Sequence, residues 1–271
     1  MSQLVANARM YAVTPRIEQA WQALIGHIAK DSGVDLTYAP YPAPQPLEVL
    51  WRRDDIGCAF MCGFPIALKL ANVTPLASPI PAMAWAQGRA VYRSDFIVRT
   101  DSAITTFEES FGKRAGWTVA HSHSGFNAFR HHLLAYRRPW RTTLYGTMSG
   151  DLVTARRVLD EVLAGTIDIG PLDAYWHHLL RRERPELFAT IRVVASTRLA
   201  PMPAFVAGPQ ASRDDVEALR VAFVAAATRP WFSSLAEDLQ LDGFAVVDHA
   251  SFAPTLRWHE DALAAGYPLP A

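Results

Sequence analysis

The chain has 271 residues, of which 50% are hydrophobic and 19% are charged. A chain of this length and composition buries a sizeable core, which excludes wholesale disorder and favours two lobes or one large α/β domain. Lysine plus arginine number 26 and aspartate plus glutamate number 26. This balance argues against a dedicated nucleic-acid-binding protein, which would need a basic field.

Strand and helix signals alternate from the start of the chain. Residues 6–13 predict a strand, and Thr14 and Pro15 follow as the N-cap and first residue of a helix that ends at Gly33. The next predicted elements are a strand at 35–41, a proline-rich loop at 40–46, a buried strand at 55–63, a short helix near Pro65, an extended run at 89–99, a strand at 115–122 and a helix at 125–138. The last are a helix at 151–164, a strand, loop and helix within 166–176, a strand at 191–197, an extended run at 201–208 and a helix at 213–227.

This alternation indicates an α/β fold with mostly parallel sheets covered by helices. In such folds, ligands bind at the carboxyl ends of the strands. The places where a ligand site is expected are therefore the junctions at 11–15, 60–65, 119–125 and 170–175.

The segment HSHSGFNAFR, residues 121–130, lies at one of these junctions. His121 and His123 alternate and could share a face, but His131 and His132 follow about two to three helical turns later. This spacing fits no standard zinc pattern, so we expect neither a metal nor a cofactor.

An anion site is the simpler interpretation of the same segment. The first N–H groups of a helix have no internal partner and carry partial positive charge. Ser122 and Ser124 would add hydroxyl donors, and Gly125 would let an oxyanion approach the backbone. His123 would donate one hydrogen bond when neutral and add charge when protonated. The residues alone leave open that Ser124 is only the N-cap of the helix and that His123 is a surface histidine.

Other junction residues are candidates for the walls of a small-ligand cleft. Three are aromatic: Tyr11, Phe64 and Tyr92. Core packing is the alternative for these side chains and is the favoured interpretation for Phe60. Asp173 follows a buried strand, where a charge is costly unless it is used. An N-cap for the helix through Tyr175 and Trp176 is its alternative role.

The two cysteines, Cys58 and Cys62, have a CxxxC spacing. This spacing matches neither a redox CxxC pair nor a four-ligand zinc pattern. We interpret both as buried apolar thiols.

Five segments, in order, carry a resemblance to a known family. They are DIGCAFMCGFP (55–65), VYRSDFIVR (91–99), SHSGFNAFR (122–130), VLAGTIDIGPLDAYW (162–176) and APMPAFV (200–206). The chain resembles the phosphate/phosphonate-type substrate-binding proteins of ABC transporters, which have the type 2 periplasmic-binding-protein fold. The resemblance implies two lobes with a ligand cleft between them. The first lobe would comprise 1–93 and 200–271 and the second 94–199, with crossings near 92–98 and 195–205.

The resemblance also implies roles for particular residues. The family often has a threonine where this chain has His123, and a Gly-Ser-His turn where this chain has 147–151. In aminophosphonate receptors of the family an acid meets the ligand's ammonium group, and the matching residue here is Asp173. With the aromatic candidates from the junctions, the predicted ligand-binding residues are Ser122, His123, Ser124, Gly125, Tyr11, Phe64, Tyr92 and Asp173.

The leading hypothesis is a binding protein for a small oxyanion such as phosphate, phosphite or a phosphonate. It would deliver its ligand to an ABC permease or act as a sensor, with no catalytic residues. A second hypothesis is an enzyme on the same fold that acts on a small carboxylate or phosphorylated metabolite, with Asp173, His123 and Cys62 as the acid–base or nucleophile candidates. A third is a binding protein for a sulfonate or an aromatic amine.

Location stays open at this stage. The family is periplasmic, but MSQLVANARMYAVTPR shows no basic start followed by an apolar run, so it does not read as a secretory signal and a cytoplasmic location is an alternative. No stretch approaches the roughly 18 uninterrupted apolar residues of a membrane span. We therefore expect no direct membrane insertion and no nucleic-acid partner.

Overall fold

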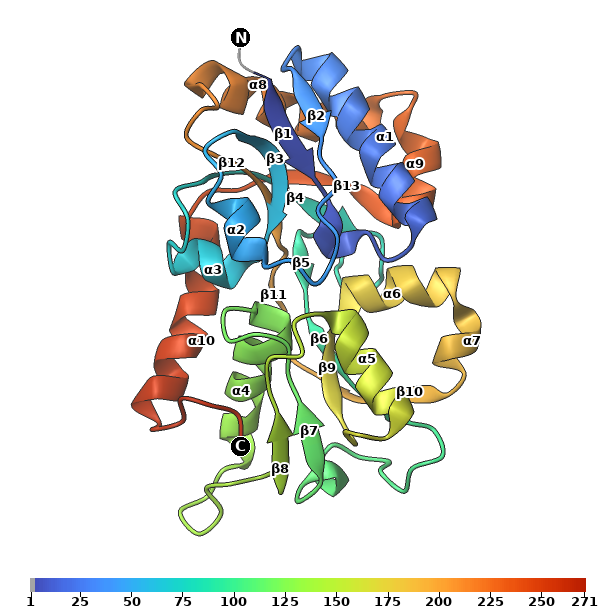
Figure 1. The fold of residues 1–271 in the computed structure, drawn as a ribbon, viewed down its shortest axis with the longest axis vertical. Helices are drawn as coiled ribbons and strands as arrows, with labels where there is room; N and C mark the ends of the chain where they lie inside the picture. Colours follow the sequence, from blue (N-terminus) through green and yellow to red (C-terminus); the bar gives the residue numbers. More distant parts are fainter. Residues whose placement is uncertain (1–2) are drawn as a thin grey trace. The chain divides into compact units, whose positions relative to one another are not determined.

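The computed structural model describes residues 3–271, which form two compact units (Figure 1). Unit 1 contains the residues up to Val91 together with Pro201–Ala253. Unit 2 contains Tyr92–Ala200 together with Pro254–Ala271. Strands and helices alternate through both units, which confirms the predicted α/β class.

A single sheet organises unit 1, with the strand order β13-β4-β12-β3-β1-β2. Its strands are β1 (Leu4–Asn7), β2 (Leu36–Tyr38), β3 (Ile56–Met61), β4 (Thr74–Pro81), β12 (Ala204–Ala207) and β13 (Leu241–Val246). β1 pairs in parallel with β2 and β3, whereas β12 lies antiparallel between β3 and β4. β13 is antiparallel to β4. Strands β1 to β4 therefore run in one direction, and β12 and β13 run in the other.

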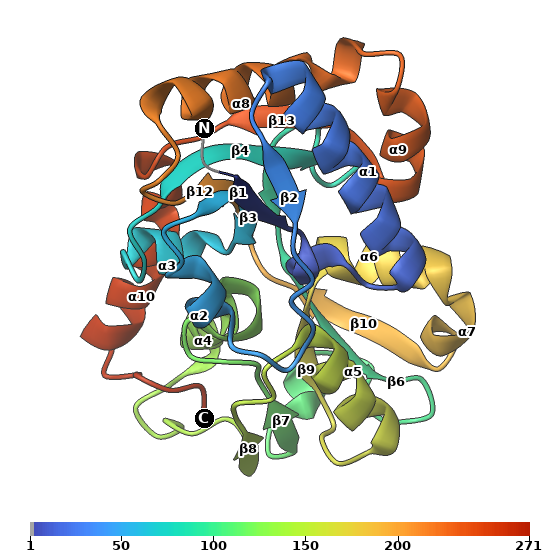
Figure 2. The same ribbon diagram turned by 45° about the horizontal axis from the view of Figure 1, so that its top comes forward.

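Side chains that alternate along β3 and β12 bury the two faces of this sheet in different ways. On one face, Phe60 and Phe205 stack with their ring centroids 3.8 Å apart, and Phe60 meets Trp21 of the first helix edge-on. Met61 and Val206 face the other side and pack in a separate cluster. The first face is covered by α1 (Pro15–Ser32), α8 (Arg213–Ala225) and α9 (Phe232–Leu239), and the second by α2 (Leu47–Trp51) and α3 (Gly63–Ala67) (Figure 2). Phe60 is thus a core residue, as predicted.

The boundaries of α1 follow the predicted local signals. The Thr14 side chain accepts a hydrogen bond from the Ile17 N–H, and Pro15 occupies the first helical position. Gly33 ends the helix with φ 72°, a left-handed conformation that a residue without a Cβ adopts without strain.

Antiparallel pairing dominates the central sheet of unit 2, where the sequence predicted mostly parallel strands. Its strands are β10 (Ile191–Ser196), β6 (Ser94–Arg99) and β9 (Gly170–Asp173), and β6 is antiparallel to both neighbours. The reason is connectivity, because β6 carries the chain into the unit and β10 carries it out. Beside them, β7 (Arg114–Gly116) and β8 (Thr147–Ser149) pair in parallel, and a bridge between Ala115 and Ile169 joins them to the residue that precedes β9. A short ribbon of β5 (Val91–Tyr92) and β11 (Ala200–Pro201) lies at two of the unit boundaries.

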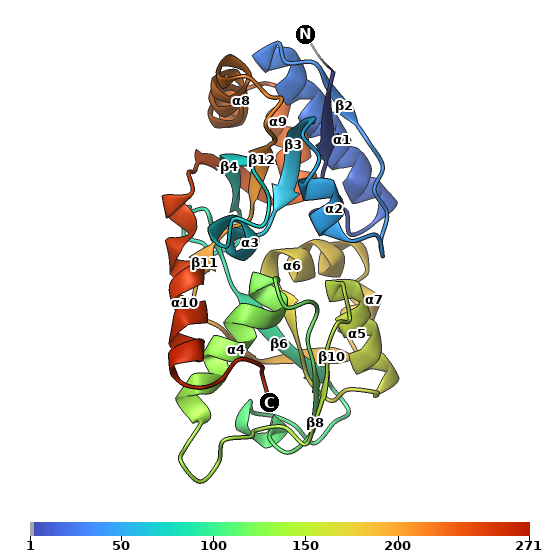
Figure 3. The same ribbon diagram turned by 60° about the vertical axis from the view of Figure 1, so that its left-hand side comes forward.

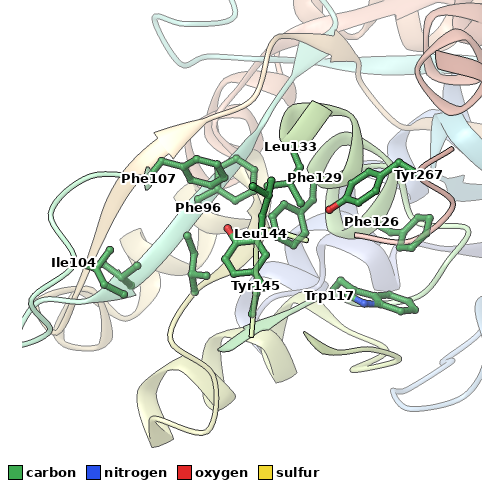
Figure 4. Packing of buried hydrophobic residues seen from close by; sticks show 13 residues of the cluster. Phe96, Ile104, Phe107, Trp117, Phe126, Phe129, Leu133, Leu144, Tyr145 and Tyr267 are labelled. Carbon is green, nitrogen blue, oxygen red and sulfur yellow. The ribbon is translucent and has the colours of Figure 1, made fainter. Parts of the chain in front are cut away.

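An aromatic cluster fills one side of this sheet. Phe96 of β6 lies 5.2 Å from Phe129 and 4.7 Å from Phe107, measured between ring centroids (Figure 4). The cluster includes Leu133 and the C-terminal Tyr267. The helices of the unit are α4 (Ala128–Leu133), α5 (Ala155–Ala164), α6 (Ala174–Glu183), α7 (Pro185–Phe188) and the part of α10 (Ala253–Ala264) that follows Ala253. α4 lies on the side of Phe96, and α5 and α6 lie on the other (Figure 3).

The C-terminal residues belong to unit 2, whereas the predicted first lobe extended to residue 271. Arg130 of α4 is 1% exposed and supplies the physical reason. Its guanidinium donates to the Pro268 carbonyl at 2.7 Å and contacts the His259 Nδ1 at 2.7 Å. Burial lowers the pKa of Arg130 to about 10. This anchor, together with Tyr267, holds Pro254–Ala271 on α4, so the chain crosses between the units a third time within α10.

No helix within residues 3–271 is long and apolar enough to cross a membrane.

Candidate functional site

The HSHSGFNAFR segment folds as a tight turn that leads into α4. Strand β7 ends at Gly116, so the predicted strand at 115–122 was wrong over most of its length. A single π-helical turn, η3 (His123–Asn127), begins two residues before the predicted helix start at Gly125. The N–H of Asn127 donates to the Ser122 carbonyl at 3.0 Å, which is the i to i−5 pattern of a π-turn. We call residues 122–127 the η3 turn.

Ser122, and not Ser124, caps this turn. The Ser122 side chain accepts a hydrogen bond from the Gly125 N–H at 3.0 Å. The Ser124 hydroxyl makes no hydrogen bond to any residue in the range 3–271, and its backbone carbonyl accepts from the Ser94 hydroxyl at 2.9 Å. The capping role considered for Ser124 therefore belongs to Ser122, and the Ser124 hydroxyl stays available as a donor.

Ser94 joins the η3 turn to the central sheet. It is the first residue of β6, is 1% exposed and lies opposite Asp173 in the β6–β9 register. Its N–H donates to the Thr197 hydroxyl at 3.0 Å. Ser94 thus brings the η3 turn, the end of β9 and the end of β10 to one place in unit 2.

Asp173 ends β9 and caps α6, which is the alternative role that its sequence position suggested. Its Oδ1 accepts hydrogen bonds from the N–H groups of Tyr175 at 2.9 Å and Trp176 at 3.0 Å. The predicted loop between strand and helix does not form, because α6 begins at the next residue, Ala174. Asp173 is 7% exposed, and these two hydrogen bonds offset the cost of burying its carboxylate.

His123 is buried and neutral, not a surface histidine. It is 1% exposed, and its ring lies 5.1 Å from Trp258 and 6.1 Å from Tyr92. Burial, with a smaller effect from the charge of His131, lowers the pKa of His123 to about 3. The Asn127 amide donates to the His123 Nδ1 at 3.2 Å. The ring proton of neutral His123 therefore resides on Nε2, which is the nitrogen that can donate.

Gly125 is required by packing within the turn. A Cβ at this position would lie 2.0 Å from the Thr118 Oγ1 and 2.8 Å from its Cγ2. Thr118 is 6% exposed, and its hydroxyl makes no hydrogen bond within residues 3–271. Close approach of an oxyanion to Gly125 stays a prediction, whereas the contact with Thr118 already explains the glycine.

The loop after β8 holds the strand end that precedes the η3 turn. Its Leu152 and Val153 N–H groups donate to the carbonyls of Trp117 and Thr118, at 3.2 Å each. Val153 has φ 65°, which is a strained conformation for a β-branched residue. This loop therefore supports Thr118 through its backbone.

Tyr92 belongs to unit 2 and Tyr11 and Phe64 to unit 1. Tyr11 is 1% exposed and packs edge-on against Phe60, with ring centroids 5.0 Å apart. Phe64 is 1% exposed within α3. Core packing, the alternative considered for the aromatic candidates, therefore describes Tyr11 and Phe64 in unit 1. Within unit 2 the structure brings Ser122, His123, Ser124, Gly125, Tyr92 and Asp173 near one another.

Sequence reasoning missed several polar residues that hold this region together. Ser94 and Asn127 are buried, and Asn127 also donates to the Thr255 carbonyl at 2.8 Å. Behind the sheet, Asp95 contacts the His177 Nδ1 at 2.9 Å and accepts from the Ser196 hydroxyl at 2.7 Å. Burial opposes ionisation of Asp95, but these hydrogen bonds and the nearby charges of His177 and Arg93 outweigh it and lower its pKa. A polar residue inside an otherwise apolar run was the available signal for Ser94 and Asp95.

Within residues 3–271, no group of three or more histidine, cysteine, aspartate or glutamate side chains could hold a metal ion. His131 stacks on Trp258 at 4.8 Å and contacts Asp261 at 3.1 Å. Cys58 and Cys62 are buried thiols outside any disulfide, as the sequence predicted, and burial raises the pKa of Cys58.

A protein-family model decides the family. The model of the ABC-transporter phosphonate periplasmic substrate-binding proteins matches residues 12–252. The chain belongs to this family. The match includes the η3 turn and the end of β9, and the family is one of binding proteins, so the enzyme hypothesis has no support. No curated protein sequence matches the chain.

Solved structures show the same fold over nearly the whole chain. A binding protein component of an ABC phosphonate transporter from Pseudomonas aeruginosa is 17% identical, with 95% of this chain and 86% of that chain covered and a TM-score of 0.77. PhnD1 from Prochlorococcus marinus, in complex with methylphosphonate, is 12% identical, with coverage of 96% and 98% and a TM-score of 0.77. A Xanthomonas citri protein bound to ATP is 19% identical, with coverage of 96% and 99% and a TM-score of 0.66. The predicted two-lobed periplasmic-binding-protein fold is confirmed.

We expect Gly125→Ala to destabilise unit 2, because the new Cβ overlaps Thr118 within a buried turn. Overpacking of this kind typically costs about 1–3 kcal/mol. Thr118→Ala in the same chain removes the two closest atoms and should recover part of the loss. Denaturant unfolding of the two single variants and the double variant measures the coupling. Gly26→Ala is the matched control, because nothing lies within 4 Å of its Cβ position; strictly additive effects at positions 118 and 125 would contradict the packing role.

Ser122→Ala should lower the free energy of unfolding by about 1 kcal/mol, because it removes the cap from the Gly125 N–H. Ser124→Ala should leave the free energy of unfolding nearly unchanged. Urea unfolding of both variants gives the comparison. A larger loss for Ser124→Ala would mean that the cap assignment is reversed.

Acidification should destabilise unit 2 through its buried histidines. Burial lowers the pKa of His132 to about 4, as it lowers that of His123 to about 3. An unfolded histidine has a pKa near 6.5, so the unfolded state binds more protons below about pH 6.5 and stability falls as the pH falls toward these native values. Unfolding midpoints between about pH 7 and pH 5 measure this slope. His123→Gln should flatten the slope, and an unchanged slope would show that His123 titrates normally in the native state.

Proposed function

We propose that the chain binds a small oxyanion, of the phosphate, phosphite or phosphonate class, at the η3 turn of unit 2. The observation that carries the proposal is the Ser-x-Ser-Gly sequence folded as the start of a helix, with one serine used as the cap and the Ser124 hydroxyl available to a ligand. The turn lies within the family match, and one relative of the same fold was solved with methylphosphonate.

The proposed site holds its anion with neutral donors. Ser124 contributes a hydroxyl, and the first turn of a helix contributes N–H groups that lack internal partners. His123 contributes at most a neutral Nε2–H, because its pKa of about 3 keeps it uncharged in ordinary conditions. Hydrogen bonds to a charged acceptor are roughly twice as strong as neutral ones, which supports binding without a cationic partner. The predicted placement of this site in a cleft between the lobes, walled by Tyr11, Phe64 and Tyr92, stays a prediction.

We propose that the chain performs no chemistry and passes its ligand to an ABC permease in the periplasm. Both steps follow the family, whose members are periplasmic substrate-binding proteins. The enzyme hypothesis would need a nucleophile beside a base. Cys62 belongs to unit 1, whereas Asp173 and His123 belong to unit 2 and take part in a helix cap and in the η3 turn.

Titration calorimetry with phosphate, phosphite, methylphosphonate and a sulfonate tests the site. Ser124→Ala should weaken oxyanion binding about ten-fold, because a charged acceptor loses a donor, and should do so without a loss of stability. Ser102→Ala is the control, because Ser102 is a serine of the same unit whose hydroxyl donates to the Arg99 carbonyl. Failure of every oxyanion to bind, or equal binding by Ser124→Ala and the parent, would rule out this site.

Asp173 is proposed to select ligands that carry an ammonium group. Aminoalkylphosphonates should then bind about ten-fold more tightly than their alkyl analogues. Asp173→Asn tests this role cleanly, because asparagine caps a helix as well as aspartate does and the variant loses only the charge. The variant should lose the preference and still bind methylphosphonate. Equal affinity of the parent for both ligand types would remove Asp173 from the site.

A further inference from the structure

A single tryptophan stands out on the surface of unit 2. Trp140 is 84% exposed, which is the highest value among the exposed large hydrophobic side chains of residues 3–271. Its place in the sequence is the loop between α4 and β8. This loop extends away from the strands of unit 2 (Figures 1 and 3). An aromatic side chain this exposed leaves a large apolar surface in water.

Trp140 lies in a hydrogen-bonded turn of the backbone. Arg138 and Arg141 exchange two backbone hydrogen bonds, of 3.2 Å and 2.9 Å, which close a four-residue turn. Pro139 occupies the second position of this turn, where its restricted φ is favourable. The turn is therefore preorganised, and the indole at its third position is held outward instead of packing against the core. We call residues 137–141 the Trp140 turn.

Arginines flank the exposed indole. Arg137 donates to the Thr142 carbonyl at 3.1 Å and to the Ala265 carbonyl at 2.9 Å, and Arg141 lies over the Phe111 ring at 4.7 Å. Arg138 donates to the Ala135 carbonyl at 3.0 Å. None of the three guanidinium groups pairs with a carboxylate within residues 3–271.

Neighbouring charges leave this turn net positive. Of the nearby acids, Glu109 binds the Thr105 and Thr106 N–H groups, and Asp168 pairs with Arg114. Glu108 lies near Tyr136, and Asp261 contacts His131 of α4. Because the arginines at 137, 138 and 141 have no carboxylate partner within residues 3–271, the turn is complementary to an anionic partner.

We propose that the Trp140 turn binds an anionic membrane surface, with the indole at the level of the lipid headgroups and Arg138 and Arg141 against the headgroup phosphates. Tryptophan prefers the membrane–water interface, where its apolar ring is buried and its N–H stays hydrated. Arginine adds electrostatic attraction to anionic lipid. A protein partner fits less well, because a stable interface needs roughly 800 Å² on each side, whereas here one aromatic side chain stands between arginines, Pro139 and exposed threonines.

Co-sedimentation of the full chain with lipid vesicles tests the proposal independently of ligand binding. The parent should sediment with vesicles of equal parts phosphatidylcholine and phosphatidylglycerol and stay in solution with phosphatidylcholine alone. Trp140→Ala should weaken binding about ten-fold. The double change Arg138→Gln and Arg141→Gln should weaken it about 25-fold, from about five-fold per charge. Added salt should weaken parent binding as well, because it screens the charges.

The double change Arg52→Gln and Arg213→Gln is the matched control, because both arginines are exposed and lie in unit 1. This control removes the same net charge as the double change in the turn. It should therefore bind anionic vesicles more tightly than the turn variant does. Equal thermal unfolding of all variants would show that the exposed turn can change without loss of the fold. Failure of the parent to bind anionic vesicles, or equal losses in the control and the turn variants, would overturn the proposal; in the first case a protein would be the remaining partner for Trp140.

Discussion

The side-chain amide of Asn127 holds the candidate site in place. Its nitrogen donates to the His123 Nδ1 and to the Thr255 carbonyl, and its oxygen accepts from Arg130. These three hydrogen bonds join the η3 turn to α4 and to the C-terminal segment in a region without solvent. Each of these hydrogen bonds pairs one buried group with another, so loss of the amide leaves several polar atoms unpaired. The same amide fixes the tautomer of His123 and with it the direction of the one proton that this ring can donate.

Local sequence signals were sufficient to predict an element whose ends are determined by residues within or next to it. Thr14, Pro15 and Gly33 predicted both ends of α1, and the apolar run around Phe60 predicted β3. Local signals failed where the backbone conformation depends on hydrogen bonds to segments distant in the chain. The residues after Gly116 have the apolar character of a strand. Their carbonyls, at Trp117 and Thr118, instead accept hydrogen bonds from N–H groups of the loop after β8, and the chain then enters η3. β4 was not predicted because it contains three prolines, at 75, 79 and 81.

The candidate site was predictable in its place but not in its internal contacts. The junction at 119–125 and the family resemblance both indicated the η3 turn. Ser122 is the cap because the helix begins with a π-helical turn at His123. The position of this turn depends on the end of β7 at Gly116. Thr118 carries no local signal, and the polar character of Ser94 in an apolar run does not show what it contacts. Their partners, Gly125 and Ser124, lie seven and 30 positions away in the chain. The antiparallel pairing in unit 2 was not predictable from local signals either. It depends on β6 carrying the chain into the unit and β10 carrying it out.

The position of β12 in the sheet of unit 1 has a consequence for synthesis of the protein. β12 lies between β3 and β4, yet it is made only after the whole central part of unit 2 has been translated. Until Ala204–Ala207 emerges, β3 and β4 lack the strand that separates them, and their backbone groups are unpaired edges. Unit 2 has most of its chain in one continuous stretch, so it can begin to fold on the ribosome first. The nascent chain therefore passes through a stage in which unit 2 is largely folded while unit 1 exposes unpaired, aggregation-prone strand edges. A chaperone would be most effective at this stage.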